Sequence, residues 1–106
     1  MRHRGFAGPD AWLAAVEREL ARPDALPVLI AKGIDPDAVR RVARIEASHA
    51  SPLGRCCLSA EQVAGATGLP RASVLRARLA LVELGLADAV TGPASAGGVQ
   101  RELHHG

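Results

Sequence analysis

The strongest constraint on the fold lies in residues 59–85, where two helix-forming segments are separated by only a short turn. Ser59 and Gln62 match the pattern Ser-x-x-Gln, in which each side chain satisfies a free backbone amide at the start of a helix. This capping box predicts a helix that begins at Ala60. Gly68 predicts its end, because glycine adopts the left-handed backbone of a helix terminus without strain.

A second helix is predicted over residues 71–84, closed by Gly85. Two helices joined by so short a turn cross at a steep angle, and the first needs a small side chain where the backbones approach. Ala64 provides that small side chain. This is the spacing of a helix-turn-helix, and the apolar side chains expected between its helices are Val63, Leu69, Val74, Ala77, Leu81 and Leu84.

The N-terminal part of the chain predicts an added helix that is capped by Asp10 and ends before Pro23. An apolar stripe recurs along it at helical spacing, formed by Trp12, Val16 and Leu20. Such a stripe packs either onto the rest of the domain or onto a second copy of the chain. The sequence leaves both possibilities open.

Two further segments precede the tight turn. In residues 24–33, Pro27 fits either the first turn of a short helix closed by Gly33 or the start of a buried strand, and the helix is the favoured interpretation. Asp35 before Pro36 predicts the start of another helix. That helix is expected to carry Val39, Val42 and Ile45 on its apolar side, and Arg40, Arg41 and Arg44 as surface charges on the other.

Short strands are predicted for residues 55–58 and within "LADAV" and "VQREL". The loop "TGPASAGG" between the last two is rich in turn-forming residues, so the pair is expected to form a small hairpin. The chain of 106 residues has the length of one small domain. The sequence therefore predicts a mainly α domain with a small C-terminal β-hairpin.

Composition limits the classes of function. The formal net charge of +2 permits nucleic-acid binding without requiring it. No apolar run approaches the roughly 18 residues of a membrane span, and the N-terminus lacks the apolar core of a signal peptide, so a cytoplasmic protein is expected. No paired acids, phosphate-binding loop or activated nucleophile points to an enzyme, and no cofactor or small-molecule ligand is predicted.

The two cysteines, Cys56 and Cys57, are adjacent in the sequence. Adjacent residues on an extended stretch point to opposite faces, so a disulfide between them is not expected. The histidines show no ligand spacing with them, and no metal site is predicted. The expectation is one buried thiol and one thiol at the surface.

The stretch "LSAEQVAGATGLPRASVLRARLALVELGLADAV" resembles the DNA-binding part of winged helix-turn-helix proteins, including IclR-type bacterial regulators, in which a "GLP" turn leads into a recognition helix closed by "LxELGL". Residues 36–103 are also similar, more loosely, to the winged-helix segment of replication initiators of actinobacterial plasmids and phages. The resemblances imply a winged helix-turn-helix domain in residues 36–106, preceded by a helical extension in residues 1–35. They imply sequence-specific binding of double-stranded DNA, in transcriptional regulation or in plasmid or phage replication.

In such proteins the second helix of the motif lies in the major groove. Carried onto this chain, the resemblance makes Arg76 the expected base reader, because a guanidinium binds guanine O6 and N7 with two hydrogen bonds. Arg71 and Arg78 flank the exposed face and are expected to contact phosphates. The predicted DNA-binding residues are Ser59, Arg71, Ala72, Ser73, Leu75, Arg76, Arg78 and Arg101.

Two features depart from the usual pattern of a DNA reader. A helical projection puts Leu75 and Leu79 on the face of the helix opposite its buried stripe. There they either contact thymine methyl groups or pack on the N-terminal helix or on another subunit. The loop "TGPASAGG" carries no basic residue for the minor groove. The alternative function is a winged helix that binds a protein partner through Leu75, Leu79 and Val82, and a homodimer stays open.

Overall fold

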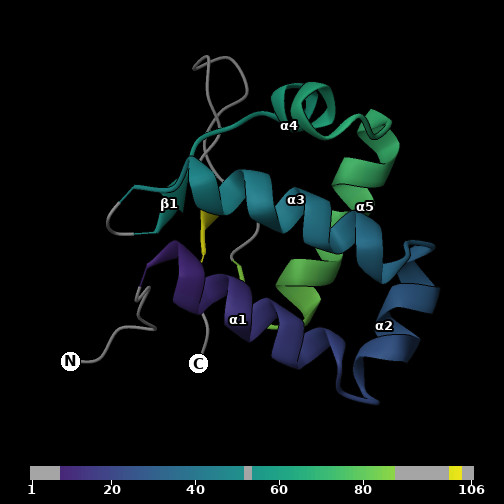
Figure 1. The fold of residues 1–106 in the computed structure, drawn as a ribbon. Helices are drawn as coiled ribbons and strands as arrows, with labels where there is room; N and C mark the ends of the chain where they lie inside the picture. The colour runs from purple at the N-terminus through teal and green to yellow at the C-terminus, as the bar shows by residue number, and fades with distance from the viewer. Residues whose placement is uncertain (1–7, 52–53, 88–100, 104–106) are drawn as a thin grey trace.

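The computed structural model describes residues 8–51, 54–87 and 101–103. Helices dominate this part of the chain, as the sequence predicts (Figure 1). In chain order the elements are α1 (Pro9–Leu20), α2 (Ala25–Lys32), α3 (Pro36–Ser48), β1 (Arg55–Cys56), α4 (Ala60–Thr67), α5 (Arg71–Glu83) and β2 (Arg101–Glu102).

Local signals in the sequence fix several helix ends. The Gln62 N–H donates to Ser59 Oγ at 3.1 Å, and the Ser59 N–H donates to Gln62 Oε1 at 2.7 Å, so the capping box is confirmed. Asp35 caps α3 by accepting a hydrogen bond from the Ala38 N–H at 2.8 Å. Gly33, with a φ of 66°, ends α2 and confirms the helical interpretation of that segment.

The start of α1 differs from the prediction. The helix begins at Pro9, and Gly8, with a φ of 104°, takes the cap position that the sequence assigned to Asp10. Proline suits the first helical position because its fixed φ is helical and no N–H is needed there. Asp10 instead lies in the first turn, where a negative charge interacts favourably with the helix dipole.

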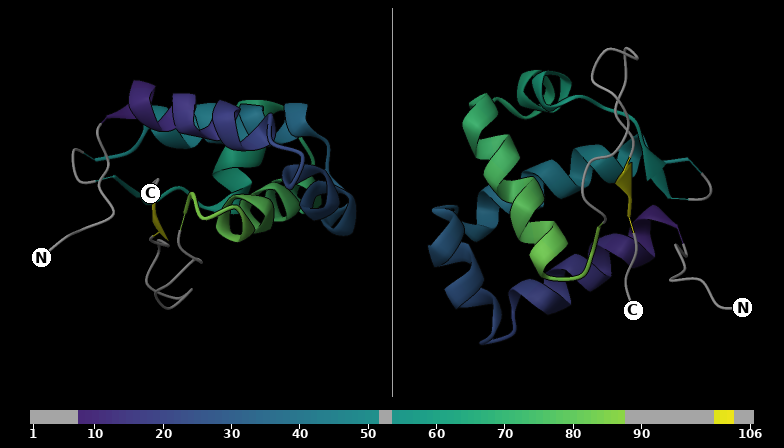
Figure 2. Two further views of the ribbon diagram at one scale, coloured as in Figure 1. Left: turned by 90° about the horizontal axis from the view of Figure 1, so that it is seen from below. Right: turned by 180° about the vertical axis from the view of Figure 1, so that it is seen from behind.

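The helices pack in two layers around one core (Figure 2). α1 and α3 lie side by side in one layer, and α5 lies in the other with α2 beside it. α4 packs against both α3 and α5. Side chains from all of these helices and from the strand segments are buried together: Trp12, Val16, Leu29, Val39, Val42, Cys56, Val63, Val74, Leu81, Leu86 and Leu103.

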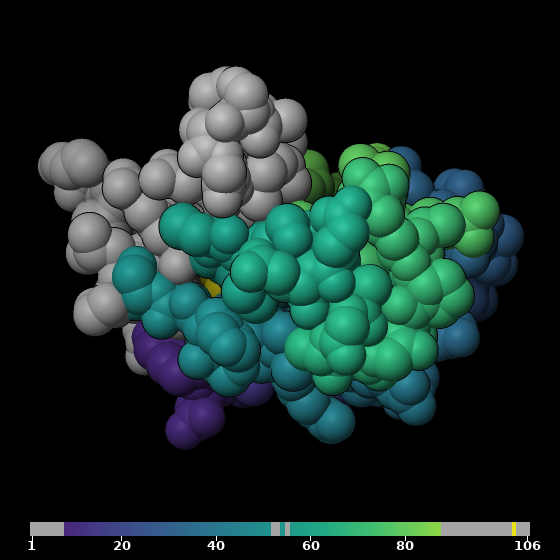
Figure 3. Space-filling view, turned by 90° about the horizontal axis from the view of Figure 1, so that it is seen from above, coloured from purple at the N-terminus to yellow at the C-terminus, as the bar shows by residue number. Residues whose placement is uncertain are grey.

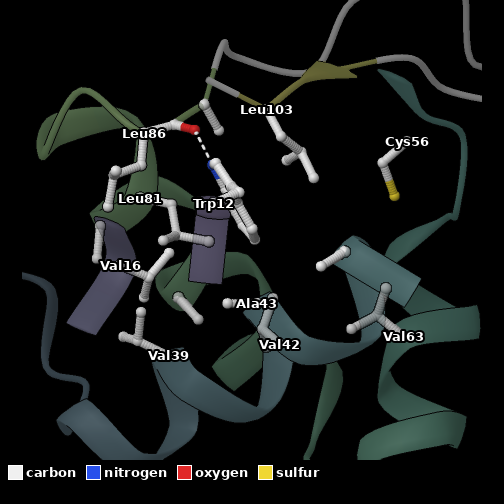
Figure 4. Packing of buried hydrophobic residues seen from close by; sticks show 14 of the residues in the cluster. Trp12, Val16, Val39, Val42, Ala43, Cys56, Val63, Leu81, Leu86 and Leu103 are labelled. Carbon is white, nitrogen blue, oxygen red and sulfur yellow. Dashed lines mark hydrogen bonds between the residues drawn. The ribbon is translucent and has the colours of Figure 1, made fainter. Parts of the chain in front are cut away.

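Trp12 fastens α1 to the segment that follows α5. Its ring is fully buried, and its Nε1–H donates to the Leu86 carbonyl oxygen at 2.9 Å (Figure 4). Val16 is buried beside it, and Leu20 packs at the edge of the same core. The apolar stripe of α1 therefore packs within its own chain and needs no second copy to cover Trp12 and Val16.

A small antiparallel pairing joins distant parts of the chain. β1 pairs with β2 with Cys56 opposite Arg101, and the Leu103 N–H donates to the Gly54 carbonyl oxygen at 2.8 Å. Leu103 also forms an antiparallel bridge to Ala87, so residues 101–103 link β1 to the segment after α5. The loop "TGPASAGG" and the predicted strand residues next to it lie outside the described residues.

Candidate nucleic-acid interface

One face of α5 is exposed along its whole length, and it is the face that the helical projection predicted. Val74, Ala77 and Leu81 are buried against the core, and α5 contacts α2, α3 and α4. The opposite side of the helix carries the exposed residues Ala72, Leu75, Arg76, Leu79 and Glu83, which we call the α5 face.

The turn that precedes α5 is built as the sequence predicted. Gly68 has a φ of 77° and its N–H donates to the Ala64 carbonyl oxygen at 2.9 Å, which ends α4. The Thr67 hydroxyl donates to the Val63 carbonyl at 2.8 Å and accepts from the Leu69 N–H at 3.2 Å. α5 starts after this short turn and runs in a different direction from α4, and the two helices share one surface of the molecule (Figure 3).

Arg76 lies in the middle of the α5 face. Its side chain is exposed and forms no ion pair with any described residue. A guanidinium without an acidic partner keeps all five of its N–H donors for a ligand. Arg76 is thus exposed, as the helical projection predicted, and its contact with DNA stays a prediction.

Arg71, at the first turn of α5, already has a partner. Its Nε donates to Glu61 Oε2 on α4 at 2.6 Å, and both side chains are exposed. The pKa of Glu61 is lowered, first by the backbone N–H at the start of α4 and then by the hydrogen bond and charge of Arg71. Glu61 is therefore ionised near neutral pH, and a phosphate would have to compete with it for Arg71.

Arg78 corrects the sequence interpretation. It was predicted to contact phosphates from the edge of the α5 face, but it is only 4% exposed. Its Nε donates to the buried carboxylate of Glu46 on α3 at 2.7 Å, and its Nη2 donates to the Leu58 carbonyl oxygen at 2.6 Å. The guanidinium is therefore used inside the fold and is not available to a ligand.

The pair of Glu46 and Arg78 also explains why the buried face of α3 differs from the predicted one. Glu46 is fully buried, whereas Ile45, the predicted core residue, is only partly buried. The available signal was a charged residue of opposite sign inside the apolar register of each of two helices that pack together. Buried charges are rare unless they are paired, but the sequence alone does not show that these two helices bring Glu46 and Arg78 together.

The remaining predicted DNA-binding residues differ in how far they are exposed. Ser59 is partly exposed, and its hydroxyl caps α4. Ala72 is exposed beside Arg76, and Ser73 is half-buried at the margin of the α5 face. The backbone of Arg101 lies in β2, while its side chain lies outside what the structure describes.

Comparison with protein families, with curated proteins and with solved structures found no match to this chain. The resemblance to winged helix-turn-helix proteins therefore stays a prediction. None of the described helices combines the length and the apolar composition that crossing a membrane requires.

The arginines of α3 lie in the layer opposite α5 (Figure 2). Arg40 donates from Nε to both carboxylate oxygens of Glu17 on α1 at 2.9 Å, and Arg41 pairs with Asp37 one turn earlier at 3.4 Å. Arg44 is exposed and has no ion pair with a described residue. These arginines are surface charges of the other layer, so Arg76 and Arg44 form a matched pair for experiments.

Sequence reasoning missed the exposed apolar residues of α2. Leu26 is 60% exposed and Ile30 is 69% exposed, while Leu29 on the same helix is buried. The signal was present, because the segment "ALPVLIAK" is apolar on all sides and a helix with one buried face must leave some of it exposed. Lys32 ties the end of α2 to Glu83 of α5 at 3.2 Å.

The described residues include both cysteines of the chain. Cys56 is buried and Cys57 is exposed, which matches the prediction of one buried and one surface thiol, and the two do not form a disulfide. Within the described ranges, no three His, Cys, Asp or Glu side chains are grouped to hold a metal ion.

A polar surface pocket lies between α1 and the turn after α5, and its lining includes Arg18, Glu19 and Arg22. Arg22 pairs with Glu19 and with Asp24.

Proposed function

We propose that this protein binds double-stranded DNA, with α5 as the recognition helix of a winged helix-turn-helix. The observation that carries the proposal is the exposed guanidinium of Arg76, without an ion pair to any described residue, on the free face of a helix that follows a tight turn. A helix held in this way fits the major groove, and its arginine can bind guanine O6 and N7 together.

Two further features support the winged form of the motif. The antiparallel pairing of residues 101–103 with β1 on one side and with Ala87 on the other supports a small C-terminal β element next to the two helices. Arg71 lies at the start of α5, where it can leave Glu61 and contact a phosphate. The resemblances favour a role in transcriptional regulation or in plasmid or phage replication. In either role α5 would bind the DNA in the same way.

The first test is the replacement of Arg76 by alanine. A selection from random duplexes supplies the preferred site, and binding to it is then measured by fluorescence anisotropy of a labelled duplex. Loss of a two-hydrogen-bond contact to guanine weakens binding by about 1–3 kcal/mol, or roughly 5- to 150-fold, and relaxes the preference at that guanine. Arg44→Ala is the matched control, and its affinity should stay close to that of the wild type.

The proposal fails if the selection enriches no duplex, or if Arg76→Ala and Arg44→Ala bind the selected site as tightly as the wild type does. A small loss of affinity that is the same for Arg76→Ala and Arg44→Ala would also count against α5 as the recognition helix, because it would reflect only the loss of one positive charge.

The second test uses the pair between Arg71 and Glu61. Glu61→Gln removes a negative charge from α4 and frees Arg71 for a phosphate, so affinity should rise for every duplex, by about two- to eightfold at 0.1 M salt, with a steeper salt dependence. Glu17→Gln breaks a comparable exposed pair in the other layer and should leave binding unchanged. Equal behaviour of the two variants would exclude Arg71 as a phosphate contact.

The second candidate function is a winged helix that binds a protein. It is favoured by the exposure of Leu75 and Leu79, which are 36% and 54% exposed. Ionic strength separates the two functions, because phosphate contacts weaken steeply with salt and an apolar protein contact responds little.

A further inference from the structure

The α5 face has an unusual composition for a surface that contacts DNA. Its central residues are Ala72, Leu75, Arg76 and Leu79, and each lies three or four positions from two of the others. Residues at these spacings are neighbours on a helix surface. Arg76 thus has the apolar Ala72 and Leu79 as its neighbours on the face, with Ser73 at the margin, and the nearest acid on the face, Glu83, is held by Lys32.

A leucine in the major groove can contact only one apolar group of the bases. Guanine, adenine and cytosine present hydrogen-bond donors and acceptors there, and thymine alone adds a C5-methyl group. A leucine that covers a polar base edge displaces the water bound to that edge. It offers no hydrogen bond in place of the one to water, so this contact is unfavourable. The apolar residues of this face therefore select for methyl groups and against unmethylated edges.

We infer that the α5 face recognises thymine through its C5-methyl group, next to the guanine that Arg76 contacts. This inference rests on the proposed DNA binding. The geometry supports adjacency, because Leu75 is next to Arg76 and Leu79 lies three residues away, or about 4.5 Å along the helix axis, which is within the spacing of one to two base pairs. Arg76 would read the guanine, and Leu75, Leu79 or both would cover the methyl group of the neighbouring thymine.

The test is a comparison of thymine with uracil, which lacks only the methyl group. Each thymine of the selected duplex is replaced by uracil in turn, and wild-type affinity should fall by about three- to tenfold at one or two positions beside the guanine read by Arg76. In the variants Leu75→Ala and Leu79→Ala, at least one should bind the thymine and uracil duplexes equally. Leu26→Ala, an exposed leucine of α2, should keep the wild-type difference.

The outcomes distinguish this inference from the proposed function. If the wild type binds the thymine and uracil duplexes equally while Arg76→Ala still weakens binding, thymine recognition is overturned and DNA binding stands. If no duplex is bound, both fail. A further pair of duplexes carries cytosine or 5-methylcytosine beside the guanine, because both thymine and 5-methylcytosine present this methyl group. A gain on cytosine methylation without a loss on uracil substitution would overturn the assignment to thymine.

Discussion

Replacing Trp12 by alanine should lower the free energy of unfolding by about 3–5 kcal/mol, the largest single effect expected from the core. The ring is fully buried between α1 and the segment after α5, and its removal leaves a cavity lined by several helices. It also leaves the Leu86 carbonyl without its 2.9 Å hydrogen bond from the indole. Because proteins of this kind unfold with only about 5–15 kcal/mol in total, this substitution should remove a large part of the stability of the fold.

Urea unfolding followed by circular dichroism measures the effect, since every variant shares the helical signal. Trp12→Phe keeps most of the buried volume but removes the donor to Leu86, so it should cost about 1–3 kcal/mol. Leu26→Ala truncates an exposed side chain and should change stability by no more than about 0.5 kcal/mol. A Trp12→Ala variant as stable as Leu26→Ala would mean that α1 does not belong to the core.

The second large effect is expected at the buried pair of Arg78 and Glu46. Arg78→Met should destabilise the fold by about 3–5 kcal/mol, because it leaves a buried carboxylate without its positive partner. The combined Glu46→Leu and Arg78→Met variant should recover much of that loss, since an apolar pair of similar volume avoids burying any charge. The same urea experiment measures all of them.

The matched control for this pair is Arg40→Met, which breaks the exposed contact with Glu17 and should cost less than about 1 kcal/mol. If the double variant were as unstable as Arg78→Met, the loss would come from side-chain packing or from the bond to Leu58 rather than from an unpaired charge. A selective loss of DNA affinity in folded Arg78→Met would instead restore the phosphate contact that the sequence suggested.

The parts of the fold that could be predicted are those set by interactions between neighbours in sequence. The capping box at Ser59, the cap at Asp35 and the left-handed glycines at Gly33 and Gly68 each depend on contacts within a few residues. Such features are local, so a single sequence shows them. The misplaced cap at Asp10 is a competition between two local signals, in which Pro9 took the first helical position.

The features that could not be predicted depend on contacts between helices. Whether Arg78 faces solvent or Glu46 is decided by how α3 and α5 cross, and no local pattern reports that angle. The partner of Arg71 was missed for a related reason, since Glu61 is ten residues earlier on a different helix. The α5 face itself followed the helical period, so its exposed residues, Arg76 included, were predicted. The pairing of Arg71 with Glu61 and the burial of Arg78 were not predicted.

Trp12 is the only tryptophan of the chain, and its ring is fully buried in the core, whereas the α5 face is exposed. Its fluorescence consequently reports the integrity of the interior and should be insensitive to a duplex bound on α5. Folding and association then give independent optical signals in one sample, the intrinsic emission for the first and a label on the duplex for the second. Damage to the scaffold and loss of a DNA contact can thus be told apart for each variant that keeps Trp12.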